Sequence, residues 1–67
     1  MNKALLRSIM VLHKDTNQSL AEYLGISVKS VNDKINENNT EFKQSEIAAI
    51  KNRYSLSDEQ VIDIFFN

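Results

Sequence analysis

The side chains that most often carry acid–base or metal chemistry are sparse in this sequence of 67 residues. His13 is the only histidine and there is no cysteine, so the common zinc sites, which need several such ligands, are not expected. Asp58, Glu59 and Asp63 lie close together, but no nucleophile, general base or phosphate-binding loop accompanies them. We therefore expect no enzyme, no small-molecule substrate, no cofactor and no metal, and interpret these carboxylates as capping and solvated groups.

A second set of chemically versatile side chains lies in residues 27–36. Val31 and Ile35 are four residues apart and predict the inward side of a helix. The outward side then presents hydroxyl, amide, ammonium, carboxylate and small apolar groups, on Ser27, Val28, Lys29, Asn32, Asp33 and Asn36. Such a face is either a plain solvated surface or one that recognises a polar partner. Lys34 is expected to face solvent or a phosphate group.

Five helices are predicted to position these groups. The chain has no proline and one glycine, a composition that favours helices and short turns. Apolar spacing predicts helices over about 3–13, 17–24, 28–36, 43–54 and 58–66. Their inward residues, with Phe42 anchoring a connector, are expected to be Leu5, Leu6, Ile9, Met10, Leu12, Leu20, Ala21, Leu24, Val31, Ile35, Ile47, Ile50, Tyr54, Val61, Ile64 and Phe65. The fold class is therefore all-α: a compact bundle of five short helices in one domain, residues 1–67.

Capping residues place the boundaries of these helices. Thr16 and Ser27 are expected to be N-caps, because a hydroxyl can accept from the free amides of a first turn. Ser57 and Gln60 have the spacing of a capping box. Gly25 stands where a left-handed residue ends the second helix, and Ile26 is expected to plug the following turn into the core.

The charges are few and unevenly distributed. The net charge is −1, but residues 1–36 carry five basic and three acidic groups, whereas residues 37–67 carry three basic and six acidic groups. The basic excess is small, so non-specific attraction to phosphates should be weak. There is no apolar run of about 20 residues and no signal peptide, so no membrane contact and a cytoplasmic location are expected.

The residues Ala21, Gly25, Ile26 and Val31 follow one another at steps of four, one and five. Together with Thr16, Leu20, Leu24, Ser27, Ile35 and Asn36 they make residues 16–36 resemble the helix-turn-helix of the lambda repressor-like family, which includes phage repressors and Cro proteins. The closing segment SDEQVIDIFF is also similar to small phage Cro-type regulators. The resemblance implies a sequence-specific transcriptional regulator of phage or prophage type that binds double-stranded operator DNA.

The resemblance also implies roles for individual residues. The helix over 28–36 would read bases in the major groove through Ser27, Val28, Lys29, Asn32 and Asp33. Phosphate contacts would come from Thr16, Asn17, Gln18, Asn36, Thr40 and Lys43. For Lys43, an exposed position at a helix start without any contact is an equal alternative.

The last helix has more apolar residues than one face of two turns can bury. If Val61, Ile64 and Phe65 cover the core, Ile62 and Phe66 are left outside. We interpret this pair as the interface of a two-fold homodimer, the alternative being a core plug at the end of the chain. The alternative function is a protein-interaction module on the same fold, such as an antirepressor that binds another regulator.

Overall fold

Five α-helices form where apolar periodicity and capping residues coincide. The computed structural model describes residues 1–66, and these contain α1 (Lys3–Leu12), α2 (Asn17–Leu24), α3 (Val28–Ile35), α4 (Gln44–Arg53) and α5 (Asp58–Phe65). No strand occurs among these residues. The expected all-α class and helix order are confirmed, and the predicted boundaries are met within one residue.

Side-chain caps start four of the helices. The Thr16 hydroxyl accepts from the Ser19 amide at 3.1 Å, and Asn2, Ser27 and Ser57 cap α1, α3 and α5 in the same way. At α5 the capping box is complete, because the Ser57 amide donates to Gln60 Oε1 at 2.9 Å. At α4 the Glu46 carboxylate accepts from the Lys43 amide at 2.8 Å. The predicted caps at residues 16, 27 and 57 are therefore confirmed.

The first four helices end in a left-handed residue. Gly25 has φ +72° at the end of α2, as expected. The equivalent residues after α1, α3 and α4 also have positive φ, although they are Lys14, Glu37 and Ser55. In each case the following amide donates back across the turn, as from Ile26 to the Ala21 carbonyl at 3.0 Å. Each helix thus stops sharply and the chain changes direction.

The core lies where the five helices meet. It is formed by Leu6, Ile9, Met10, Leu20, Ala21, Val31, Ile35, Phe42, Ile50, Tyr54, Leu56 and Ile64. One expectation was wrong: Leu12 is 78% exposed. It follows Met10 by two residues, about 200° around the helix, so it points away from the side that Met10 buries. Leu56, which lies in a connector and was not expected in the core, is buried.

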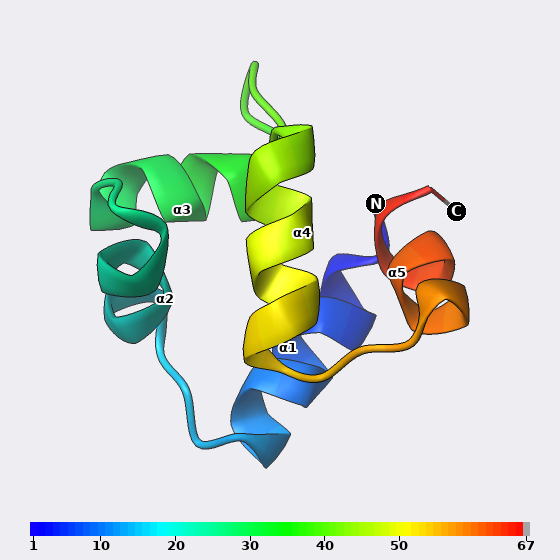
Figure 1. Cartoon of the computed structure of the whole chain (residues 1–67). Helices are drawn as coiled ribbons and strands as arrows, with labels where there is room; N and C mark the ends of the chain where they lie inside the picture. The colour runs from blue at the N-terminus through cyan, green and yellow to red at the C-terminus, as the bar shows by residue number, and fades with distance from the viewer. Residues whose placement is uncertain (67) are drawn as a thin grey trace.

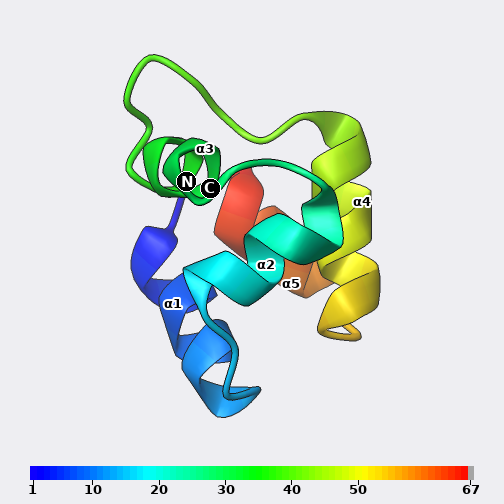
Figure 2. The same ribbon diagram turned by 90° about the vertical axis from the view of Figure 1, so that its left-hand side faces the viewer.

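In Figure 1, α2 and α3 lie on one side of α4, and α5 lies on the other. Figure 1 shows α3 lengthwise and α2 from its end, and Figure 2, turned by 90°, shows the reverse, so these two helices cross steeply. The start of the chain lies beside the end of α5, because the Asn2 amide donates to the Ile64 carbonyl at 2.7 Å. A radius of gyration of 10.7 Å matches the roughly 11 Å expected for one compact body of this length.

Candidate nucleic-acid interface

The turn between α2 and α3 fixes the position of α3. Ala21 is buried in α2, and its small side chain suits a close approach between helices. Gly25 supplies the left-handed turn, and Ile26 packs partly buried against the core. Val31 and Ile35 then hold α3 from within. The side of α3 opposite Val31 and Ile35 is left exposed.

That side carries the residues expected to read bases. Val28 and the side chains of Ser27, Lys29 and Asn32 are exposed, while Asp33 is half-buried. The Ser27 hydroxyl is also occupied as the cap of α3. The structure therefore brings all five residues onto one continuous surface.

Two of these side chains are already paired with each other. The Lys29 ammonium lies 2.8 Å from Asp33 Oδ2, one helical turn away. The hydrogen bond from Lys29 holds the pKa of Asp33 below its usual value, and the same bond raises the pKa of Lys29. The positive charge of Lys29 is thus balanced by the negative charge of Asp33 on the same face.

Residues expected to contact phosphate border this surface on both sides. At the start of α2, the Asn17 amide group donates to the Asn32 side-chain carbonyl, which joins α2 to the outer face of α3. Thr16 and Gln18 are exposed beside it. Across α3, Thr40 and Lys43 are exposed on the connector to α4, and Asn36 accepts from Lys3 Nζ at 3.3 Å. The start of α2 and the connector after α3 therefore lie on either side of α3 (Figure 2).

Lys34 does not face solvent, which corrects the expectation for this residue. It is 8% exposed, and its ammonium lies 2.7 Å from Glu46 Oε1. Burial opposes ionisation of Glu46, but the hydrogen bonds from Lys34 and from the Lys43 amide outweigh it and lower the pKa of Glu46. The pair joins the end of α3 to the start of α4. Sequence periodicity does not reveal this ion pair, because periodicity does not indicate that Lys34 meets a residue twelve positions away.

A second network, also missed from the sequence, fixes the start of α2. Asp15 accepts from Arg53 Nε at 2.7 Å, from Arg53 Nη2 at 3.0 Å and from the Tyr54 hydroxyl at 2.5 Å. It also accepts from the Thr16 amide at 3.1 Å, directly before α2. The hydrogen bonds from Arg53 outweigh burial and lower the pKa of Asp15 to about 2. The guanidinium also lies over the Tyr23 ring, 4.7 Å from its centre.

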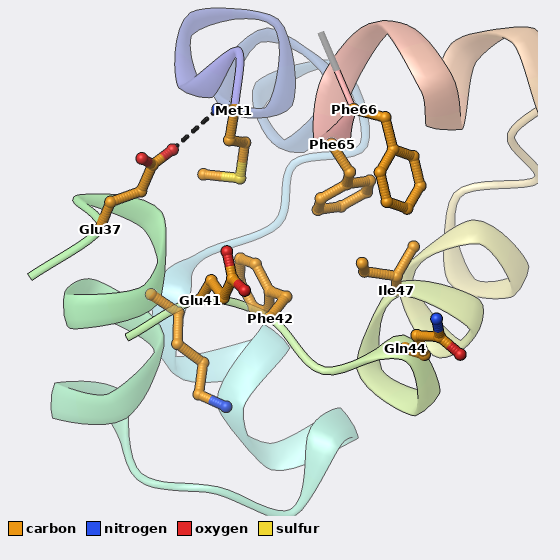
Figure 3. A pocket seen from close by; sticks show the side chains of 9 residues that line it. Met1, Glu37, Glu41, Phe42, Gln44, Ile47, Phe65 and Phe66 are labelled. Carbon is orange, nitrogen blue, oxygen red and sulfur yellow. Dashed lines mark ion pairs between the residues drawn. The ribbon is translucent and has the colours of Figure 1, made fainter. Parts of the chain in front are cut away.

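The end of α5 has exposed apolar groups beside a hollow that also borders the connector between α3 and α4. Ile62 and Phe66 are 55% and 64% exposed, whereas Ile64 is buried and Phe65 packs on the core, as expected. Phe66 borders a hollow of about 380 Å³ (Figure 3) whose apolar lining comes from Phe42, Phe65 and Ile47. The carboxylates at its edge belong to Glu37 and Glu41, and the N-terminal amine lies 2.8 Å from Glu37 Oε1.

Among residues 1–66 there is no group of three histidine, cysteine or acidic side chains placed to hold a metal ion. In the same part of the chain, every helix is too short or too polar to cross a membrane. Comparisons with protein-family profiles, with curated proteins and with solved structures found no match to this chain.

Proposed function

We propose that this protein is a sequence-specific DNA-binding regulator with a lambda repressor-like helix-turn-helix, of the small Cro-like phage or prophage type, acting in the cytoplasm. The observation that carries the proposal is the steep crossing of α2 and α3, with the polar side of α3 left exposed. A helix can enter the major groove only if its neighbours do not cover the side that meets the bases. The exposed residues of α3 meet this condition.

The side chains on α3 match the groups that base pairs present in the major groove. Lys29 can donate to guanine O6 and N7, and Asn32 can pair with adenine N6 and N7. Val28 can contact a thymine methyl group, and Asp33 can accept from cytosine N4. Ser27, at the helix start, can donate to either type of base.

Groups on both sides of α3 suit the phosphate backbone. The first amides of α2, with Thr16, Asn17 and Gln18 around them, form the positive end of a helix dipole. On the other side, Asn36 at the end of α3 and Thr40 and Lys43 on the next connector add polar groups and one cation. Such contacts would hold α3 in register without reading sequence.

The experiment is selection from a pool of random-sequence duplexes, followed by gel-shift titration. We expect enrichment of a two-fold symmetric site. Lys29→Ala and Asn32→Ala should each weaken binding to that site by about 5- to 150-fold, the range for loss of a base contact. Lys51→Ala is the matched control, because Lys51 lies on α4 and pairs with Asp58. Circular dichroism must show that the variants remain folded.

A second candidate is a protein-interaction module that binds another regulator. The hollow favours it, because its apolar lining suits an apolar side chain, and Glu41 at its edge, which makes no ion pair within residues 1–66, suits a basic neighbour. The selection separates the two functions. Failure to enrich any sequence, even at low salt, contradicts DNA reading and leaves the interaction module.

A further inference from the structure

The exposed charge of α3 is balanced within the helix. Of its two lysines, Lys34 is buried against Glu46, and Lys29 is held by Asp33 at 2.8 Å. The two partners of the second pair are unequally fixed. The Lys29 side chain is 83% exposed, but that of Asp33 is 30% exposed. The backbone of Asp33 is held as well, since its carbonyl accepts from the Asn38 amide at 2.9 Å.

This pairing affects any approach to DNA. Non-specific affinity comes from cations that meet phosphates and release counterions. If Lys29 turns to a phosphate, it leaves the carboxylate of Asp33 unpaired beside the negatively charged backbone. A G·C pair behaves differently, because guanine offers O6 and N7 as acceptors and cytosine offers its N4 amine as a donor. Both partners can then exchange their mutual hydrogen bond for one with a base.

We propose that Lys29 and Asp33 act as one neutral unit that recognises a G·C pair, and that Asp33 determines specificity by restraining Lys29 from binding phosphates. The inference rests on the proposed function. It goes further because it makes the acidic residue act through the lysine, and because it names the base pair. The selected site should therefore contain an invariant G·C pair in each half.

A double-mutant cycle tests the coupling. The proteins are the wild type, Asp33→Asn, Lys29→Ala and the double variant, each titrated with the selected site and with a random-sequence duplex. The matched control is Asp63→Asn, which makes the same change of charge at an exposed position of α5. Asparagine keeps the size of the side chain and an acceptor oxygen at residue 33, and thermal melting checks that each variant is folded.

We expect Asp33→Asn to raise affinity for the random-sequence duplex by about 3- to 10-fold at about 100 mM salt, with a salt dependence about one unit steeper. The ratio of specific to non-specific affinity should fall, and the G·C preference should relax when the selection is repeated. In the Lys29→Ala background the same substitution should change non-specific affinity by less than about twofold. Asp63→Asn should also have less than about a twofold effect, because α5 lies on the other side of α4 from α3 (Figure 1).

Two results overturn the inference while the proposed function stands. One is that Asp33→Asn and Asp63→Asn change the affinity for the random-sequence duplex equally. The other is that Asp33→Asn still raises this affinity in the Lys29→Ala background. The first means that only net charge matters, and the second means that Asp33 repels DNA directly. If the wild type itself enriches no site, the proposed function fails and the inference fails with it. Titration of the Asp33 carboxyl by NMR checks the pair in the free protein. Its pKa should rise toward the usual value in Lys29→Ala, and an unchanged pKa would contradict the pairing.

Discussion

Asp15 lies in the connector between α1 and α2, and four donors converge on its carboxylate from Arg53, Tyr54 and Thr16. The charged form of Asp15 is therefore favoured in the folded protein, where its pKa is about 2 rather than 3.8. A carboxyl with a depressed pKa stabilises the fold above its unfolded pKa, and this contribution disappears as the pH falls through the folded value. The relevant window here is from about pH 4 to about pH 2.

We expect Asp15→Asn to lower the free energy of unfolding by about 2 kcal/mol at about pH 6. The difference from the wild type should shrink steadily below about pH 4 and be largely gone near pH 2. Urea denaturation followed by circular dichroism measures it. Asp63→Asn is the control, since Asp63 is exposed and makes no ion pair within residues 1–66. A difference that stays constant from about pH 6 to about pH 2 would show that the carboxylate does not carry the effect.

At the scale of the helices, three helix ends place a residue with a side chain in a conformation that favours glycine. Lys14, Glu37 and Ser55 adopt the left-handed conformation that glycine adopts after α2. For a residue with a side chain, this conformation costs about 1 kcal/mol or more. A Cβ added to Gly25 would meet no atom within 4 Å, so the cost there would come from the backbone alone. The cost of this conformation can therefore be tested by introducing glycine at one such helix end and by removing it at another.

Ser55→Gly should raise the free energy of unfolding by about 1 kcal/mol, and Gly25→Ala should lower it by about the same amount or more. In a domain of this size each change corresponds to a shift of about 4–8 °C in the melting temperature. Ser8→Gly is the control, because Ser8 is exposed inside α1 and glycine there should destabilise by about 0.5–1 kcal/mol. If Ser55→Gly behaves like Ser8→Gly, residue 55 is not strained in solution.

The helices were predictable because their signals are local. Thr16, Ser27 and Ser57 each cap the helix they precede, and the apolar steps around them identify the buried sides. The exposure of α3 followed from the same periodicity. The pairs Lys34–Glu46 and Asp15–Arg53 were not predictable, because periodicity does not show which charged residues meet across 12 or 38 positions. The left-handed Ser55 was missed for a similar reason, since nothing in its residue type marks that conformation.

At the scale of the whole molecule, one copy of the protein has little unpaired positive charge with which to bind DNA. The net charge is −1, and the cation on the outer face of α3 is paired. Binding two half-sites together raises affinity without any new contact. The body is 27 Å in its longest direction, so two copies in contact can place their α3 helices about 34 Å apart, one turn of B-DNA.

The exposed Ile62 and Phe66 are the proposed contact between two such copies. Phe66→Asp should shift the protein from dimer to monomer in sedimentation at high micromolar concentration, because two buried carboxylates would replace two rings. It should also weaken binding to the full two-fold site by about 100-fold, while binding to an isolated half-site changes little. Leu12→Asp is the matched control, since Leu12 is more exposed but lies at the end of α1. If the wild type runs as a monomer, or if Leu12→Asp rather than Phe66→Asp separates the copies, this interface is wrong.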